Sequence, residues 1–179
     1  VFEGIDKAGK TTLIKKIKKI LEKNKKIITI SYPLRNNITG TLINNILSEH
    51  KNNLSPELVH LLFSANRWEH SQELKTLLEQ YDIILCDRYI YSGLAYSMAS
   101  GISYEWAKSS DFGLPLSDIV FYFDIDPLIA NKRYENNKKE KFETVAFQQK
   151  VYDSYKTIAD KFIIENYNDL QKVQINFEI

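Results

Sequence analysis

Residues 4–11 read Gly-Ile-Asp-Lys-Ala-Gly-Lys-Thr, and this segment restricts the possible folds more than any other part of the chain. It satisfies the pattern G-x-x-x-x-G-K-[S/T], a loop that joins a strand to a helix and surrounds phosphates with backbone N–H groups. An apolar strand end precedes it and an amphipathic helix follows. We therefore predict a nucleoside triphosphate site in which Lys10 contacts the β- and γ-phosphates and the Thr11 hydroxyl binds Mg²⁺. The loop residues expected at the triphosphate are Gly4, Lys7, Ala8, Gly9, Lys10, Thr11 and Thr12.

The rest of the sequence alternates short apolar runs with longer helical patterns, which is typical of an α/β fold. Strands are expected at residues 1–3, 27–32, 82–87, 118–125 and 173–179. Helices are expected at residues 10–23, 39–48, 56–80, 89–100, 127–136 and 145–166. The central apolar runs are almost continuous, as in a parallel sheet that is covered on both faces. The prediction is one three-layer α/β/α domain over residues 1–179, with a five-stranded parallel sheet and a short lid at about residues 132–143.

Composition and charge argue against several classes of protein. The 24 basic and 23 acidic side chains give a net charge of +1, whereas nucleic-acid binding usually needs a clear basic excess. No apolar run is long enough to span a bilayer, so neither nucleic acid nor membrane is an expected partner. The single cysteine, Cys86, cannot form an internal disulfide and is interpreted as a core residue. A reducing compartment is therefore expected, the cytoplasm first and the nucleus as an alternative. Because the chain begins at Val1 inside a strand pattern, we expect the natural N-terminus to be missing.

Four of the basic residues are arginines, namely Arg35, Arg67, Arg88 and Arg133. The surface charge of this chain comes mostly from lysine. An arginine is then expected where a planar, two-pronged donor is needed. We therefore treat all four arginines as candidate ligand contacts.

Polar residues near two strand ends point to a second substrate. Triphosphate oxygens would repel Asp6, so we expect Asp6 to face a hydroxyl of that substrate, while Lys7 bridges the two phosphates between which a group moves. Asp87 and Arg88 follow an apolar strand, at the end where open α/β sheets bind ligands. We expect Asp87 at the Mg²⁺ ion and Arg88 on a phosphate, with Asp124 as the alternative metal-side acid.

Three residues of the helix expected after Pro56 share one face: Phe63, Asn66 and Arg67. An aromatic ring beside a forked donor suits a planar base, because the ring stacks and the guanidinium donates to a carbonyl oxygen. A core Phe beside a surface Arg remains the alternative from these residues alone. The histidines lack the spacing of metal ligands and are interpreted as structural: His50, His60 and His70.

These residues belong to longer segments, and the order of the segments along the chain can be compared with known families. The segments are residues 2–12, 32–35 (Tyr-Pro-Leu-Arg), 61–69 (Leu-Leu-Phe-Ser-Ala-Asn-Arg-Trp-Glu), 87–89 (Asp-Arg-Tyr), 91–96, 113–115 (Gly-Leu-Pro), 142–143 and 146–148. Together they resemble the thymidylate kinase family of P-loop nucleoside monophosphate kinases, in its eukaryotic and large-DNA-virus branch. The likeness runs from Val1 to about Tyr155.

The resemblance implies the reaction ATP + dTMP → ADP + dTDP, with Mg²⁺ as cofactor and a homodimer as the assembly. It assigns the transfer step to Asp6, Lys7, Lys10 and Arg88. Such transfers are in line and form no covalent enzyme intermediate. The acceptor is already an anionic phosphate, so no general base is required.

The resemblance also implies contacts to each part of the two nucleotides. Arg35 and Arg88 would hold the dTMP phosphate, Phe63 would stack on thymine, and Arg67 would donate to its O4. Arg133 would lie against adenine.

For the sugar, the resemblance implies that Asp6 accepts from the 3′-hydroxyl and that Tyr96 excludes ribose. The full set expected at dTMP is Asp6, Arg35, Phe63, Asn66, Arg67, Arg88, Ser92, Tyr96, Phe142 and Gln148.

Three positions depart from the family pattern. Tyr32 and Leu34 stand where Phe and a polar residue are common, and Phe142 stands where Tyr is frequent. Lys7 replaces an Arg, which keeps the charge but removes the two-pronged geometry. The alternatives that remain are a kinase for another nucleoside or nucleoside monophosphate and a catalytically inert nucleotide-binding scaffold.

Overall fold

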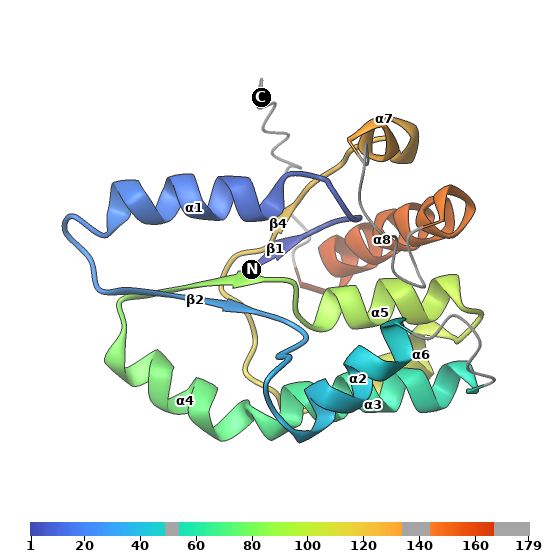
Figure 1. The fold of residues 1–179 in the computed structure, drawn as a ribbon, viewed down its shortest axis with the longest axis horizontal. Helices are drawn as coiled ribbons and strands as arrows, with labels where there is room; N and C mark the ends of the chain where they lie inside the picture. The colour runs from blue at the N-terminus through green and yellow to red at the C-terminus, as the bar shows by residue number, and fades with distance from the viewer. Residues whose placement is uncertain (49–53, 134–143, 167–179) are drawn as a thin grey trace.

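The computed structural model describes residues 1–48, 54–133 and 144–166, and shows a parallel sheet with helices on both faces (Figure 1). Its strands are β1 (Phe2–Glu3), β2 (Ile27–Ser31), β3 (Ile83–Asp87) and β4 (Phe121–Tyr122), in the order β2-β3-β1-β4. The predicted α/β/α architecture is confirmed. The described part of the chain supplies four strands, and the fifth predicted strand at residues 173–179 lies outside it.

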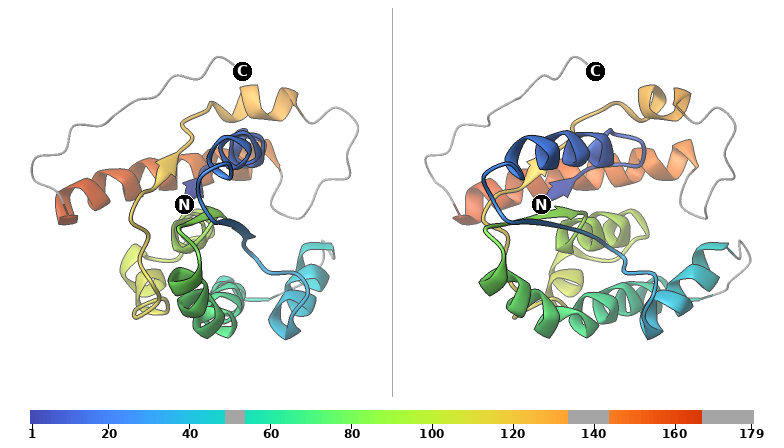
Figure 2. Two further views of the ribbon diagram at one scale, coloured as in Figure 1. Left: turned by 90° about the vertical axis from the view of Figure 1, so that its left-hand side faces the viewer. Right: turned by 60° about the vertical axis from the view of Figure 1, so that its left-hand side comes forward.

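The helices are α1 (Lys10–Leu21), α2 (Ile38–Ser48), α3 (Pro56–Glu69), α4 (Ser71–Gln80), α5 (Ile90–Ala99), α6 (Tyr104–Ser109), α7 (Pro127–Lys132) and α8 (Val145–Asn166). Helix α1 covers one face of the sheet, and α3, α4 and α5 lie on the other side (Figures 1 and 2). Helix α8 packs along α5. Within the described ranges, no helix combines the length and the apolar character that crossing a membrane requires.

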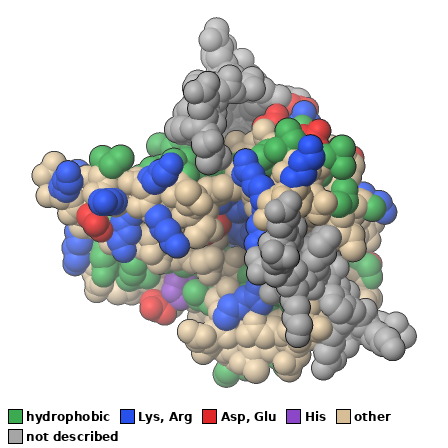
Figure 3. Space-filling view, turned by 45° about the horizontal axis from the view of Figure 1, so that its top comes forward, with side chains coloured by type: hydrophobic (Ala, Val, Ile, Leu, Met, Phe, Trp, Pro, Cys, Tyr) green, Lys and Arg blue, Asp and Glu red, His purple; other side chains and the backbone are tan. Residues whose placement is uncertain are grey.

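Helix α1 shows how sequence periodicity determines packing. Ile14 points into a core cluster with Phe2 of β1 and Leu85 of β3, and both strands are buried there. Lys15 and Lys16, which follow Ile14, are exposed. Figure 3 shows lysine and arginine side chains scattered over one face of the molecule. Burial of the apolar side of α1 therefore fixes this helix on the sheet. The first turn of α1 then lies next to the end of β1.

The register of the parallel strands brings the predicted motifs to one edge of the sheet. Phe2 of β1 pairs with Asp87 of β3, and the Arg88 N–H donates to the Phe2 carbonyl at 3.0 Å. The Tyr32 N–H, just after β2, donates to the Asp87 carbonyl at 3.0 Å. The carboxyl ends of β1, β2 and β3 thus meet where open α/β sheets bind ligands.

Two of the predicted element boundaries are wrong. The helix expected at residues 56–80 breaks at His70 into α3 and α4, because α3 packs on α5 whereas α4 turns back onto β3. His70 is buried at this corner, where its Nδ1 hydrogen-bonds to the Tyr32 hydroxyl at 2.7 Å. The strand expected at residues 118–125 narrows to β4, since the ladder with β1 extends over only Phe121 and Tyr122.

One helix has no counterpart in the sequence-based prediction. Helix α6 begins after Ser103, whose hydroxyl accepts a hydrogen bond from the Trp106 N–H at 3.3 Å. Ser55 caps α3 in the same way, by accepting from the Leu58 N–H. The signal for α6 was therefore present, but the helix spans only residues 104–109 and is too short to show a periodicity.

Candidate active site

The phosphate loop closes around the N-terminus of α1 because three of its residues adopt left-handed or extended positive-φ conformations. These are Gly4 (φ 142°), Lys7 (φ 61°) and Gly9 (φ 103°). A Cβ atom at Gly4 would lie 2.9 Å from the carbonyl oxygen of Phe123, the residue after β4, so only glycine fits there. The glycines of the motif are thus required by backbone geometry, and the loop curves around the position that an anion would occupy.

Lys10 is buried inside this loop, with 5% of its surface exposed. Its ammonium donates to the carbonyl of Gly4 at 3.1 Å and to that of Ile5 at 2.7 Å. Burial, followed by the nearby positive charge of Arg88, lowers the pKa of Lys10 to about 7. A bound phosphate would supply the missing counter-charge and restore the protonated form.

Thr11 and Asp87 form the part of the site that suits a magnesium ion. The Thr11 hydroxyl donates to Asp87 Oδ2 at 2.6 Å, which joins the first turn of α1 to the end of β3. A hydroxyl and one carboxylate are the donor set that Mg²⁺ uses when substrate phosphates complete its coordination. The alternative acid, Asp124, is half-exposed, pairs with Lys156 at 3.8 Å and does not border the cavity described below.

Asp6 is the centre of a cluster that links the phosphate loop to α5 and α8. Its carboxylate accepts from Arg88 Nη2 at 2.5 Å, from the Tyr96 hydroxyl at 3.0 Å and from Gln148 Nε2 at 2.9 Å. The Gln148 side-chain oxygen in turn accepts from the Asp6 N–H at 3.1 Å. The predicted acceptor-site residues Asp6, Arg88 and Tyr96 are therefore in direct contact, and Gln148 holds Asp6 from behind.

Arg88 occupies a strained position that this cluster stabilises. Its φ is +66°, which a non-glycine residue adopts only at a cost. Besides Asp6, its guanidinium donates to the Gly4 carbonyl at 3.0 Å and to the Ser92 hydroxyl at 3.2 Å. These bonds fix the guanidinium between the phosphate loop and α5.

Glu3 supports the same region and was not predicted. It is 1% exposed, and its carboxylate accepts from the N–H groups of Tyr89 and Ser92, from the Ser92 hydroxyl and from the Tyr155 hydroxyl, at 2.5–3.2 Å. It thereby satisfies N–H groups at the start of α5, which has no side-chain cap of its own. In the sequence, the one indication of this role is that Glu3 is an acidic residue at the end of an apolar strand pattern.

A cavity of about 1170 Å³ runs from the phosphate loop to α3. Every predicted site residue borders it except Gly4 and Gln148, while Phe142 lies outside the described residues. Phe63 and Arg67 lie at its α3 side, and Arg133 closes the loop side with a hydrogen bond to the Lys7 carbonyl at 3.0 Å. Of the predicted lid, only Lys132 and Arg133 are described.

Arg35 borders the cavity from the segment after β2, where its Nη1 donates to Asn44 Oδ1 of α2 at 2.6 Å. Asn66 positions this segment. It is completely buried, accepts from the Leu34 N–H at 2.8 Å and donates to the Leu34 carbonyl at 2.9 Å. Its amide also donates to Asn37 and Thr39, so the side chain is used within the protein although it borders the cavity.

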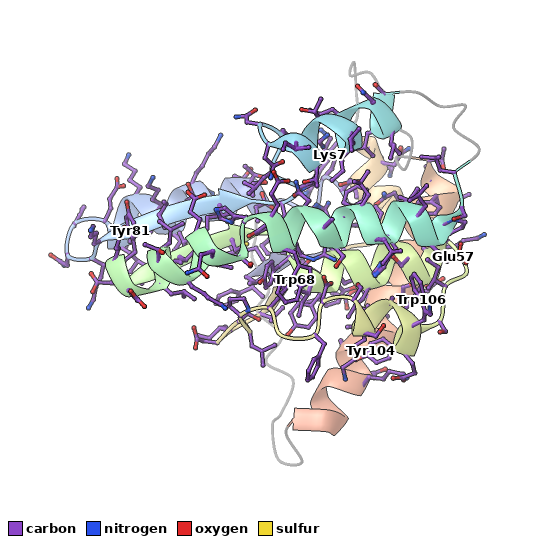
Figure 4. All side chains as sticks on the ribbon, turned by 90° about the horizontal axis from the view of Figure 1, so that it is seen from below. Lys7, Glu57, Trp68, Tyr81, Tyr104 and Trp106 are labelled. Atoms are coloured by element: carbon purple, nitrogen blue, oxygen red, sulfur yellow. The ribbon has the colours of Figure 1, made fainter. Side chains whose placement is uncertain are left out.

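Arg67 is paired with Asp111, a residue that the sequence analysis missed. Its Nε and Nη2 donate to the two carboxylate oxygens of Asp111 at 3.1 and 2.6 Å, and both side chains are almost fully buried. The neighbouring Trp68 extends from α3 toward the turn after α6 and donates to the Ser110 carbonyl at 2.8 Å (Figure 4). Arg67 is therefore a buried arginine, which excludes the alternative of a surface Arg beside a core Phe.

The residues interpreted as structural are buried. His70 and Cys86 lie in the core around Tyr32, where burial raises the pKa of the Cys86 thiol above its ordinary range. His60 hydrogen-bonds to the hydroxyls of Ser97 and Ser110 at 2.6 and 2.7 Å, and it also borders the cavity. The remaining histidine, at position 50, lies outside the described residues.

Three comparisons with known proteins agree on one family. The family described as thymidylate kinase matches residues 2–177. The thymidylate kinase of Plasmodium falciparum is 38% identical over 176 residues, covering 97% of this chain and 83% of that protein. The thymidylate kinase of Danio rerio is 39% identical over 160 residues, covering 88% and 74%.

A solved structure of thymidylate kinase from Candida albicans superposes with a TM-score of 0.82 at 34% identity, covering 92% of this chain and 78% of that one. The motifs, the sheet topology and these matches lead to the same conclusion. The chain belongs to the thymidylate kinase family, the ATP-dependent phosphotransferases that convert dTMP to dTDP.

Proposed function

We propose that this chain binds ATP and Mg²⁺ at the phosphate loop, binds dTMP in the adjoining cavity, and transfers the phosphoryl group between them. The observation that carries the proposal is the position of Arg88. Its guanidinium is held on Asp6 and on the Gly4 carbonyl, at the junction between the phosphate loop and the cavity. A cation fixed there can contact an acceptor phosphate and the transferring group together.

Transfer needs positioning and charge neutralisation more than chemistry from the protein. Lys10 would hold the β- and γ-phosphates, and the exposed Lys7 would follow the transferring group between donor and acceptor. Thr11 and Asp87 would hold Mg²⁺, which would supply positive charge to neutralise the phosphates. Arg35 and Arg88 would orient the acceptor phosphate, whose oxygen is already ionised, so that no side chain has to remove a proton.

The sugar would lie against Tyr96 and Asp6. The Tyr96 hydroxyl and Gln148 both donate to Asp6 Oδ2, and Arg88 donates to Oδ1, so a 3′-hydroxyl would share Oδ1 with Arg88. Burial raises the pKa of the Tyr96 phenol above its ordinary range, so the group stays a neutral donor at every physiological pH. A 2′-hydroxyl would have to displace the phenol ring, which is the physical basis of deoxyribose selection.

The test is an assay of ADP release with ATP and Mg²⁺ across dTMP, dUMP, UMP, dCMP and thymidine. We expect dTMP to be the best acceptor, UMP to be rejected for its ribose, and thymidine to be inert because it lacks the phosphate. Phosphorylation of thymidine would instead indicate a nucleoside kinase. ATP binding without turnover on any acceptor would indicate an inert scaffold.

We also propose that the chain works as a homodimer, which is what the family resemblance implies. Leucines exposed on α3 are compatible with an interface: Leu58 and Leu61 are 50% and 46% exposed. Sedimentation equilibrium at assay concentration tests this, and a monomer with full activity would contradict it.

The cytoplasmic location stays a prediction from the sequence.

A further inference from the structure

We propose that Asp111 is a positioning residue that orients the guanidinium of Arg67 and thereby makes the enzyme select a base with a carbonyl at C4. The proposal rests on the proposed function, because it takes Arg67 to be the base contact. It adds a residue from the turn after α6 to the machinery of the acceptor site.

The first observation is how the guanidinium is used. Nε and Nη2 donate to the two oxygens of Asp111, at 3.1 and 2.6 Å, in a parallel two-pronged pair. Nη1 is then the nitrogen that no described residue engages, and Arg67 borders the cavity. The pair therefore leaves one edge of the guanidinium as the donor toward a ligand.

The second observation is that the guanidinium has no room to turn. A Cβ atom built on Gly93 would lie 2.7 Å from Nη2, 3.0 Å from Nη1 and 3.1 Å from Cζ of Arg67. The guanidinium thus lies directly against the backbone of α5. The backbone at Gly93 packs against the face of the Arg67 guanidinium, and Asp111 binds its Nε and Nη2 atoms, so the guanidinium is held in one orientation.

Asp111 is itself held from α3. The Ser64 hydroxyl donates to Asp111 Oδ1 at 2.7 Å and Trp68 Nε1 donates to the carbonyl of the preceding Ser110 at 2.8 Å. Both partners lie within one turn of Arg67 on the same helix. The turn after α6 is therefore attached to α3 around Arg67, so that the carboxylate and the guanidinium share one rigid support.

Charge and donor direction then determine which base fits. Asp111 neutralises the buried Arg67, so a neutral base meets a directed N–H donor and no net charge. A carbonyl oxygen at C4 accepts from that donor, whereas the amino group of cytosine would place a donor against a donor. A site built to donate one hydrogen bond rejects a base that cannot accept it much more strongly than a merely apolar pocket would.

The experiment compares kcat/KM for dTMP and dCMP in the parent, Asp111→Asn, Arg67→Met and the double variant. We expect Asp111→Asn to lower the dTMP-to-dCMP ratio at least tenfold, mainly through the KM for dTMP, with the KM for ATP changed less than twofold. In the Arg67→Met background, Asp111→Asn should leave the ratio unchanged, because Asp111 acts through Arg67. The matched control is Asp118→Asn, which removes an exposed carboxylate outside the cavity and should leave every constant unchanged.

Two results would overturn the proposal: an unchanged ratio in Asp111→Asn, or an equal loss of the ratio in both backgrounds. If Asp111→Asn does not fold, Asp111→Glu retains the charge but moves the carboxylate, and a parental ratio in that variant would also overturn it. Failure of the proposed function looks different. Arg67→Met would then leave the dTMP-to-dCMP ratio at its parental value, whatever Asp111 does.

Discussion

Replacing Lys10 with methionine should remove catalysis and at the same time stabilise the nucleotide-free protein. Methionine has a similar length and fills the same space without a charge. Lys10 is 5% exposed, and without a bound phosphate its ammonium is buried beside the positive Arg88. The carboxylates of Asp6, Asp87 and Glu3 compensate this charge only in part, so the nucleotide-free parent carries an unfavourable charge that a bound phosphate would offset.

The pKa of Lys10 gives the size of the effect. A decrease from 10.5 to about 7 corresponds to roughly 4–5 kcal/mol of destabilisation of the charged form relative to the unfolded chain. The variant loses the hydrogen bonds to the Gly4 and Ile5 carbonyls, about 1 kcal/mol each. The expected net gain in unfolding free energy is therefore about 2–3 kcal/mol near pH 6.5, where the parent is protonated.

The pH dependence of this gain has a definite sign. Between about pH 7 and 10.5 the unfolded chain holds the Lys10 proton and the folded chain does not, so the parent becomes more stable as the pH rises. The variant lacks this contribution. Its advantage over the parent should therefore be largest below pH 7 and should shrink steadily toward pH 10.

The assay is urea unfolding of the parent and Lys10→Met without nucleotide, at pH 6.5, 8 and 9.5, with turnover measured in parallel. Lys15→Met is the matched control, since Lys15 is an exposed lysine five residues further along α1. We expect no pH-dependent gain in the control and a loss of several orders of magnitude in kcat for Lys10→Met. A Lys10→Met protein that is less stable than the parent at pH 6.5, or whose advantage does not depend on pH, would refute the argument.

Three further predictions test other parts of the site. Arg88→Lys should weaken dTMP binding at least tenfold and leave thymidine binding unchanged, because only the phosphate needs the two-pronged donor; equal losses measured by calorimetry would make Arg88 structural. Asn66→Ala should lower the unfolding free energy by about 2–4 kcal/mol, since it strands the buried Leu34 N–H and carbonyl, and a loss below 1 kcal/mol in urea unfolding would contradict that role. Asp87→Asn should raise the Mg²⁺ concentration needed for half-maximal turnover at least fivefold by weakening the site shared with Thr11, and an unchanged Mg²⁺ titration would place the metal elsewhere.

The phosphate loop and its surroundings were predictable because the determinants are local. Glycines at fixed positions, a lysine and a threonine at the start of an amphipathic helix require one backbone path whatever surrounds them. Asp87 and Arg88 were predictable for a related reason. They follow an apolar strand, and in a parallel sheet the carboxyl ends of neighbouring strands meet at one edge.

The break at His70 shows where local patterns stop being informative. Residues 56–80 carry no glycine and no proline after Pro56, and both halves are good helix formers. The chain turns there because α3 and α4 pack on different partners, and the hydrogen bond between His70 and Tyr32 spans 38 residues. Helix propensity is a local property of each residue, so it cannot predict a break that depends on a partner 38 residues away.

The polar pairs that orient the site were decided by the tertiary structure. Arg67 meets Asp111 across 44 residues, Asn66 meets Leu34 across 32, and Glu3 meets Tyr155 across 152. The sequence by itself determined which charged and polar residues were available, and the fold buried Arg67 and Glu3, which then each need a partner because an unpaired charge in the interior is costly. Which of the many acids, amides and hydroxyls became that partner depended on how α3, α5, α6 and α8 pack against one another, and packing is a property of the whole fold.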